Sequence, residues 1–379
     1  MKRALIFASV ASMIDQFNMR NISILQELGY EVDVACNFET GSSTSEKQVK
    51  RLIEELKEKN IGMYHIPIPR KLTTLNDLIK SFKETKKVSK TKKYDIVHCH
   101  SPIGGVIARQ IFKDFRKKGT RVIYTAHGFH FFKGAPLKNW LIYYPIEKWY
   151  SKYTDTLITI NKEDKKIAKE KLSSKNLEYI PGIGIETKKN IVFDKEKKLK
   201  ELKISTQDIV LLSVGELNKN KNHEIVIKAI SELQINNIQY IVCGKGELDE
   251  KLNKLVADLN VSGKVKFLGF RNDIDEICMV SDLFIFPSYR EGLSVALMEA
   301  MSFGLPVICS NIRGNIDLID EGKGGYLQPP SDILEITKNL NKLLKNKQLR
   351  NRMGDYNKNK IREFDKKIVD DKMRKIYTY

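Results

Sequence analysis

The feature that most constrains the fold is a repeated alternation of short apolar, β-branched runs with longer segments of helical period. In the first half of the chain the runs are RALIFASV, YEVDVAC, DIVHCHS, RVIYTAHG and DTLITIN. In the second half they are DIVLLSVG, IQYIVCGKG, VKFLGF, DLFIFPS and LPVICSN. Continuous apolar runs flanked by helices are typical of parallel strands that are covered on both faces. The sequence therefore predicts an α/β protein with two doubly wound, Rossmann-like domains.

The domain junction is indicated by a Pro/Gly break and a lysine-rich stretch, after which the alternation restarts near residue 208. We place the N-terminal domain at 1–188 and the C-terminal domain at 189–362. We also expect the charged, helical segment at about 363–379 to pack back on the N-terminal domain. A length of 379 residues agrees with two domains. Two such domains imply a central cleft, and ligands of open α/β sheets bind at the carboxyl ends of the strands.

The cellular compartment is constrained by the cysteines and by the N-terminal segment. The five cysteines are scattered and never form a CxxC pair, which fits reduced thiols in a cytosol. The start, MKRALIFASVASMIDQF, imitates a short signal peptide, but RALIFASV reads equally well as a buried strand and Asp15 interrupts the apolar run. No apolar run reaches the roughly 18–20 residues that span a bilayer. We therefore expect a cytoplasmic location.

Net charge is unevenly distributed along the chain. Of the total of +19, residues 1–188 carry +14, from 34 Lys/Arg and 20 Asp/Glu, and the remainder carries +5. Such a skew indicates a polyanionic partner or an anionic membrane facing the first half. Lysine-rich solvation of helices would give the same count. Motifs that read nucleic acid are missing from the sequence, so no nucleic-acid partner is expected.

An aromatic segment in the first half, FHFFKGAPLKNWLIYYPIEKWYSKY, contains both tryptophans and interleaved lysines. Aromatic rings beside long lysine side chains are typical of an interfacial membrane contact. Packing of a helix inside the N-terminal domain would use the same residues. Both interpretations stay open at the level of sequence.

The stretch 288-SYREGLSVALMEAMSFGLPVICSN-311 places two carboxylates, Glu291 and Glu299, eight positions apart. DLFIFPS reads as a strand, YREG as a turn, and LSVALMEAMSFG as a helix closed by Gly304. Glu291 would then lie at the helix entrance and Glu299 about two turns along. Unpaired N–H groups at a helix entrance suit a diphosphate, and here they belong to Gly292, Leu293 and Ser294.

The run EGLSVALMEAMSFGLPV resembles the E-x7-E signature of glycosyltransferase family 4, the retaining enzymes with the GT-B fold. The similarity extends over nearly the whole chain, because YDIVHCHSPIGGVIAR, VIYTAHGF, LLSVGEL, VCGKGEL, VKFLGFRNDI and GGYL follow in the order of that family. The chain is most similar in character to bacterial capsule and exopolysaccharide glycosyltransferases. The resemblance thus implies two Rossmann-like domains that face a central cleft.

The resemblance also implies roles for individual residues. Glu291 would bind hydroxyls of the donor sugar, Lys221 the leaving diphosphate, and His127 the donor sugar from the N-terminal side. These three residues form the expected catalytic set. Glu299 would hold the ribose hydroxyls of the nucleotide. The remaining residues expected to bind the donor are Gly292, Leu293, Ser294, Arg271, Gly215, Glu216, Asn220 and Gly244.

Two departures from the family pattern stand out. Glu216, in 215-GEL-217, replaces the usual arginine beside the diphosphate, and an acid there cannot neutralise phosphate. The loop after the first strand, ASVASMIDQFNM, lacks the usual glycines. No metal or other cofactor is expected, because His98 and His100 lack acid or thiol partners at fitting distance. Without a DxD-like acid pair, Lys221 and the helix N-terminus would carry the departing charge.

We therefore expect a retaining glycosyltransferase that moves a hexose or N-acetylhexosamine from a UDP-linked nucleotide sugar. The expected acceptor is a polyprenyl-diphosphate-linked glycan in capsule or exopolysaccharide assembly, at the inner face of the cell membrane. A UDP-N-acetylhexosamine 2-epimerase of related fold is one alternative, although its catalytic acids cannot be assigned. A non-enzymatic polyanion-binding protein is another, since it would explain the charge of +19.

Overall fold

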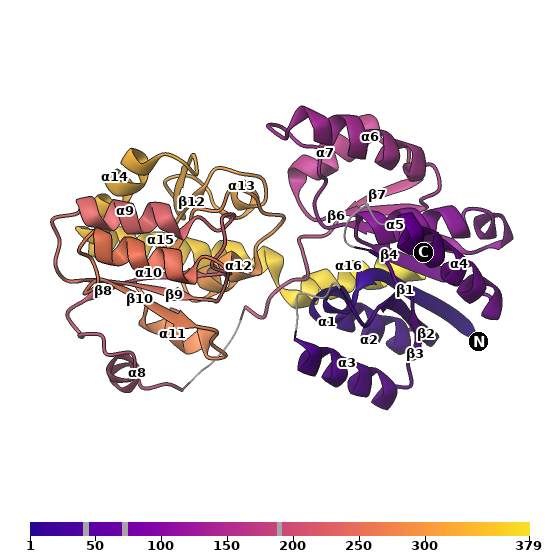
Figure 1. The fold of residues 1–379 in the computed structure, drawn as a ribbon, viewed down its shortest axis with the longest axis horizontal. Helices are drawn as coiled ribbons and strands as arrows, with labels where there is room; N and C mark the ends of the chain where they lie inside the picture. Colours follow the sequence, from indigo (N-terminus) through magenta and orange to yellow (C-terminus); the bar gives the residue numbers. More distant parts are fainter. Residues whose placement is uncertain (41–44, 70–74, 188–191) are drawn as a thin grey trace. The chain divides into compact units, whose positions relative to one another are not determined.

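The computed structural model describes residues 1–40, 45–69, 75–187 and 192–379, which form two compact units (Figure 1). The N-terminal unit comprises Met1–Ile183 together with Lys367–Tyr379, and the C-terminal unit comprises Gly184–Lys366. The predicted junction at 188/189 lies outside the described residues. The N-terminal unit is therefore built from both ends of the chain.

The N-terminal unit contains a seven-stranded parallel sheet of order β3-β2-β1-β4-β5-β6-β7. Its strands are β1 (Lys2–Val10), β2 (Tyr30–Asn37), β3 (Gly62–His65), β4 (Ile96–His100), β5 (Arg121–Ala126), β6 (Thr156–Thr159) and β7 (Asn176–Tyr179). Its α-helices are α1 (Ala11–Phe17), α2 (Met19–Glu27), α3 (Glu46–Glu58), α4 (Leu75–Thr91), α5 (Pro102–Phe112), α6 (Leu137–Ser151), α7 (Lys162–Lys171) and α16 (Lys366–Thr378). The stretch that imitates a signal peptide forms the interior strand β1 and the helix α1 that follows it.

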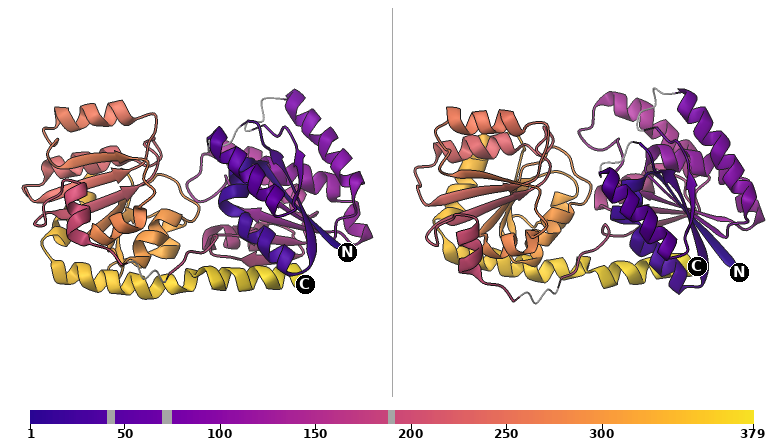
Figure 2. Two further views of the ribbon diagram at one scale, coloured as in Figure 1. Left: turned by 90° about the horizontal axis from the view of Figure 1, so that it is seen from below. Right: turned by 60° about the horizontal axis from the view of Figure 1, so that its bottom comes forward.

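Both faces of this sheet are buried, as the continuous apolar runs predict. Alternate residues of β1 enter different clusters, with Ala4 and Ile6 on one face and Leu5 and Phe7 on the other. The first cluster also contains Val369, Met373, Ile376 and Tyr377 of α16. Both views of Figure 2 show α16, in yellow, against the N-terminal unit. The last helix of the chain thus completes one face of the first sheet.

The C-terminal unit contains a six-stranded parallel sheet of order β10-β9-β8-β11-β12-β13. Its strands are β8 (Ile209–Val214), β9 (Ile238–Cys243), β10 (Val265–Gly269), β11 (Leu283–Phe286), β12 (Val307–Ser310) and β13 (Gly325–Gln328). Its α-helices are α8 (Lys195–Glu201), α9 (His223–Glu232), α10 (Asp249–Asp258), α11 (Ile274–Val280), α12 (Val295–Ser302), α13 (Asn315–Leu318), α14 (Ile333–Leu344) and α15 (Lys347–Lys360). In both sheets the strand order reverses beside the first strand, β1 or β8, and open α/β sheets bind ligands at such a point.

Candidate functional site

The loop from β11 into α12 carries the two predicted glutamates. Helix α12 begins at Val295, two residues later than predicted, because Ser294 adopts an extended conformation and its hydroxyl caps the Leu297 N–H at 3.3 Å. Glu291 therefore lies in the loop before the helix, and Glu299 lies on the helix. Within the described residues, the N–H groups of the loop residues Gly292, Leu293 and Ser294 make no intramolecular hydrogen bond. These donors remain available at the edge of the sheet.

Lys221 and Glu291 form an ion pair at the carboxyl ends of β8 and β11. The Lys221 Nζ atom lies 2.8 Å from Glu291 Oε1, and the two side chains are 20% and 13% exposed. The same ammonium lies 4.6 Å from the centre of the Phe286 ring. The family resemblance assigns Lys221 to the diphosphate and Glu291 to the sugar. In the structure these two side chains are in contact and only partly exposed to water.

The two loops that carry this pair are joined by backbone contacts. The Tyr289 N–H donates to the Asn220 carbonyl at 2.8 Å, and the Asn220 amide donates to the Arg290 carbonyl at 3.0 Å. Asn220, which was predicted to bind the nucleotide sugar, thus holds the loop after β8 against the loop after β11. Lys221 is held in turn by its N–H, which donates to Asn218 Oδ1 at 3.0 Å.

Close backbone approach explains the predicted glycines in this region. A Cβ on Gly244 would lie 1.9 Å from the Gly215 carbonyl oxygen, and one on Gly215 would lie 3.1 Å from Cε of Lys221. Gly314 was not predicted from the sequence, and a Cβ there would lie 1.7 Å from the Gly292 carbonyl oxygen. Gly314 also has a φ of +81°, which favours glycine. The loop after β12 therefore packs directly on the loop that carries Glu291.

Glu216 and Arg271 lie at the rim of the same sheet edge. The exposed Glu216 carboxylate accepts a hydrogen bond from the Asn218 amide at 3.0 Å. Arg271 pairs with Asp273 and with Glu201 of α8. The hydrogen bonds that Arg271 donates to Asp273 and Glu201 raise the pKa of Arg271, so its guanidinium stays charged and paired with these two acids. Its backbone remains the part that could meet a nucleotide base.

Glu299 occupies the middle of α12 and is half-buried. Its backbone carbonyl accepts hydrogen bonds from the Ser302 hydroxyl at 2.7 Å and from the Phe303 N–H at 3.2 Å. These contacts hold the last turn of α12, which ends as predicted before Gly304. Glu299 thus comes from a rigid helix, whereas Glu291 comes from a loop.

His127 follows β5 in the N-terminal unit. Its Nε2 atom lies 3.1 Å from Nδ1 of His100, and its ring meets the Phe17 ring edge-on at 5.3 Å. Burial lowers the pKa of His127 to about 4, so the imidazole is neutral at pH 7. A neutral ring can donate or accept one hydrogen bond without carrying charge to a sugar.

The alternating histidines of β4, His98 and His100, are buried, and His98 is held by protein partners. His98 lies between the Tyr377 hydroxyl and the Thr125 hydroxyl, both at 2.7 Å, so both of its ring nitrogens have protein partners. Burial lowers the pKa of His98 to about 3. Across the described parts of the chain, no group of three or more His, Cys, Asp or Glu side chains is arranged to hold a metal ion.

The aromatic segment divides between packing and exposure. Phe129 and Phe131 stack at 4.8 Å in the core, and Trp140 meets Phe131 at 5.4 Å. Other apolar side chains of α6 are exposed, namely Leu137, Leu141, Ile142 and Trp149. Packing inside the N-terminal unit therefore accounts for part of the segment, and the membrane interpretation stays a prediction for the exposed part. None of the helices in the described ranges is both long enough and apolar enough to cross a membrane.

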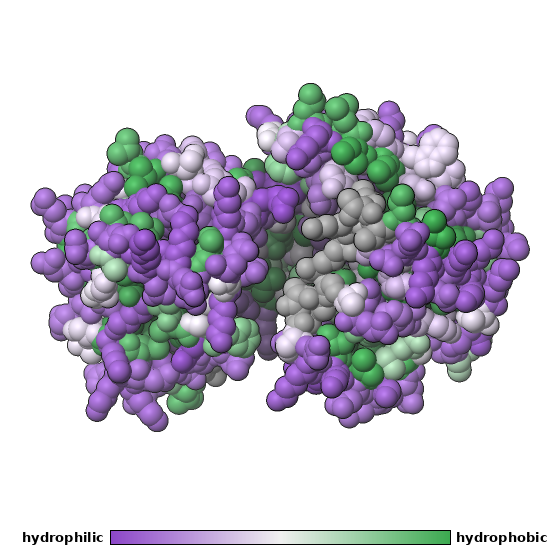
Figure 3. Space-filling model, viewed as in Figure 1, coloured by the Kyte–Doolittle hydropathy of each residue, from purple (hydrophilic) through white to green (hydrophobic). Residues whose placement is uncertain are grey.

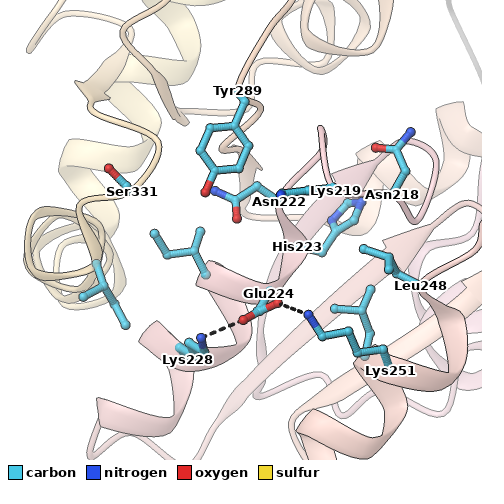
Figure 4. Close-up of a pocket in the computed structure, with 13 residues that line it drawn as sticks. Asn218, Lys219, Asn222, His223, Glu224, Lys228, Leu248, Lys251, Tyr289 and Ser331 are labelled. Atoms are coloured by element: carbon cyan, nitrogen blue, oxygen red, sulfur yellow. Dashed lines mark hydrogen bonds and ion pairs between the residues drawn. The ribbon is translucent and has the colours of Figure 1, made fainter.

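A cavity of about 540 Å³ adjoins the loops that carry Lys221 and Glu291 (Figure 4). Tyr289 and Asn218 come from those loops, while Glu224 binds Lys228 and Lys251 on the opposite wall. None of the residues predicted to bind the donor lines this cavity. It lies beside the candidate site and is not part of it.

Comparison with known proteins identifies the family. Residues 194–360 match the family described as Glycosyl transferases group 1, and residues 6–161 match Glycosyl transferase 4-like. EpsD of Bacillus subtilis (strain 168), whose name assigns it provisionally to the glycosyltransferases, is 34% identical over 100% of this chain and 96% of its own length. An Escherichia coli protein is 30% identical over 92% of this chain and 89% of its own. That protein is named UDP-Gal:alpha-D-GlcNAc-diphosphoundecaprenol alpha-1,3-galactosyltransferase.

The fold of this chain is also similar to that of a protein of known structure. The Anabaena protein HepE, crystallised in complex with UDP, superposes with a TM-score of 0.77 at 17% identity, and each chain is covered completely. The predicted GT-B fold is confirmed, and family membership selects a transferase over the epimerase and polyanion-binding alternatives. With its two parallel-sheet units, its E-x7-E loop and helix, and relatives that match along its whole length, this chain belongs to family 4 of the GT-B glycosyltransferases.

Proposed function

We propose that this glycosyltransferase moves a hexose or N-acetylhexosamine from a UDP-sugar to a polyprenyl-diphosphate-linked glycan, with retention of anomeric configuration. The Escherichia coli relative is named for a UDP-galactose donor and a diphosphoundecaprenol-linked acceptor, which supports both substrate classes. The pathway proposed is capsule or exopolysaccharide assembly.

The observation that carries the proposal is the Lys221–Glu291 pair beside the unpaired N–H groups of residues 292–294. A diphosphate needs a cation and N–H donors, and a sugar needs carboxylate acceptors for its hydroxyls. The loop after β11 supplies the carboxylate and the N–H groups, and the loop after β8 supplies the cation. No metal is part of this proposal, since Lys221 and the N–H groups would carry the leaving charge.

In the proposed reaction, Lys221 leaves Glu291 and pairs with the diphosphate, while Glu291 accepts hydrogen bonds from the donor sugar. Glu299 holds the ribose hydroxyls. The bond from the anomeric carbon to the diphosphate oxygen breaks, and the acceptor oxygen forms its bond on the same face. The acceptor proton passes to the departing diphosphate. His127, neutral at pH 7, hydrogen-bonds the donor sugar.

A peripheral position on the inner face of the cell membrane completes the proposal. Exposed apolar residues of α6 alternate with lysines, and residues 1–188 carry a charge of +14. Apolar contact together with attraction to anionic lipids is how peripheral proteins hold a membrane surface.

The test is transfer from a panel of UDP-hexoses and UDP-N-acetylhexosamines to a polyprenyl-diphosphate-linked glycan, followed by NMR of the product anomer. We expect one preferred donor and a retained configuration. A product of inverted configuration would remove the proposed mechanism. Release of an epimerised UDP-sugar without any transfer would remove the proposed function itself.

A further inference from the structure

A second cavity, of about 580 Å³, lies wholly within the N-terminal unit. It opens where β1 and β4 end, and helices α4, α5 and α6 form its walls. Most of its lining is apolar: Val10, Pro69, Leu78, Phe82, Pro102, Ile103, Val106, Tyr143 and Ile146. The volume is within the range of cavities that enclose a small organic ligand.

The polar lining residues are few, and three of them, Ser9, Ser101 and Glu147, already have hydrogen-bond partners within the protein. Ser9 and Ser101 share a hydrogen bond of 2.6 Å between their hydroxyls. The Glu147 carboxylate is held by Arg109 at 2.9 Å and by the Tyr124 hydroxyl at 3.0 Å. A ligand therefore meets mainly hydrocarbon walls and a stacked pair of rings, since His130 lies 4.5 Å from Tyr143.

The walls of the cavity continue into exposed apolar surface on the same two helices. On α4, Leu78 and Phe82 line the cavity while Leu75 and Ile79 are 67% and 54% exposed. On α6, Ile146 lines the cavity, and Leu137, Leu141 and Ile142 are exposed. Figure 3 shows hydrophobic surface, in green, over α6. Apolar side chains of α4 and α6 are therefore found both in the cavity wall and on the surface of this unit.

We propose that this cavity takes the hydrocarbon chain of the lipid-linked acceptor, so that the isoprene units next to the diphosphate enter the protein. The inference rests on the proposed function, which supplies a polyprenyl acceptor. A lipid held only by the membrane would need the exposed apolar residues but no interior cavity. The apolar walls stabilise a bound chain by removing its CH₂ and CH₃ groups from water.

The experiment uses farnesyl diphosphate and inorganic pyrophosphate as probes, in buffer without vesicles or detergent and with saturating UDP. We expect calorimetry to show farnesyl diphosphate binding at least about tenfold more tightly than pyrophosphate, because burying two CH₂ groups is already worth that much. Val106→Trp fills the cavity and should abolish this gain. Equal affinity of the two probes, or an unchanged gain in Val106→Trp, would overturn the proposal.

The matched control is Ile79→Asp, which changes an exposed residue of α4 one position from the cavity-lining Leu78. It should bind farnesyl diphosphate like the parent protein and lose affinity only for anionic vesicles. A urea-unfolding transition like that of the parent protein shows that the N-terminal unit of Val106→Trp is folded. If the protein transfers sugar to a lipid acceptor but farnesyl diphosphate does not bind, the cavity inference fails and the proposed function stands. If farnesyl diphosphate binds but no sugar is transferred to any acceptor, the proposed function fails and the cavity still binds a hydrocarbon chain.

Discussion

Lys221 Nζ and Glu291 Oε1 lie 2.8 Å apart although 70 positions of sequence separate the two residues. The pair joins the loop after β8 to the loop after β11. A diphosphate that binds Lys221 has to replace this carboxylate as its counter-ion. Glu291 is then free to face the hydroxyls of the sugar, so one exchange of partners would prepare both groups.

Glu291→Gln should therefore separate binding from turnover. The Glu291 carboxylate competes with the diphosphate for Lys221. Its loss should tighten UDP binding roughly two- to fivefold, which corresponds to the free energy of a partly exposed ion pair. Turnover should fall about tenfold, because an amide oxygen accepts a hydrogen bond from the sugar less strongly than a carboxylate. Calorimetry with UDP and initial rates with the preferred donor measure the two effects. Glu216→Gln removes a charge from the loop that carries Lys221, so equal tightening there would indicate a general charge effect.

Glu299→Ala should weaken UDP binding about 10- to 100-fold, the loss expected for hydrogen bonds to a charged group. The ribose assignment can be tested with 2′-deoxy-UDP. The parent protein should bind it less tightly than UDP, whereas Glu299→Ala should bind both alike. An undiminished preference for UDP in the variant would assign the ribose to another residue.

The stability of the protein should fall as the pH is lowered from 7 to 5. Burial lowers the pKa of His98 to about 3 and those of His127 and His223 to about 4. In the unfolded chain each titrates near 6.5, so below that pH the unfolded state binds more protons. Each histidine then lowers the free energy of unfolding by about 1.4 kcal/mol for each pH unit below 6.5. Urea unfolding at several pH values measures this slope, which His98→Gln should reduce; an unchanged slope would contradict the assignment.

Arg109→Met should lower the free energy of unfolding by about 3–5 kcal/mol, because it leaves the buried Glu147 carboxylate without its cation. The side chains of Arg109 and Glu147 are 1% and 8% exposed. Replacing both residues, by Met and Leu, should recover much of the loss. Arg116→Met breaks the more exposed pair with Asp155 and should cost less than about 1 kcal/mol. Equal losses in the two single variants, by urea denaturation, would contradict this account.

Local pattern was sufficient for most of the fold. Continuous apolar runs such as RALIFASV became parallel strands, and Gly304 followed by Pro306 ended α12 as expected. The predicted start of α12 was wrong because the apolar residues on both sides of Ser294 in LSVAL hide the capping preference of this serine. A capping residue inside an apolar run was the signal that could have corrected it.

Contacts between distant parts of the chain could not be read in the same way. The Lys221–Glu291 and Arg109–Glu147 pairs depend on which strands and helices become neighbours, and no spacing in the sequence encodes that. The cavity walls of α4 and α6 likewise carry ordinary helical periods. Their apolar faces become a cavity only because α5 lies between them.

The burial of Tyr377 has a consequence for the order in which the chain can fold. Its ring is fully buried, and its hydroxyl meets His98, a residue of the central strands synthesised long before it. While the ribosome is still producing the second sheet, one face of the first sheet lacks α16, and His98 lacks its hydrogen bond to the Tyr377 hydroxyl. The earlier-made half of the protein can therefore reach its final packing only after α16 has been synthesised.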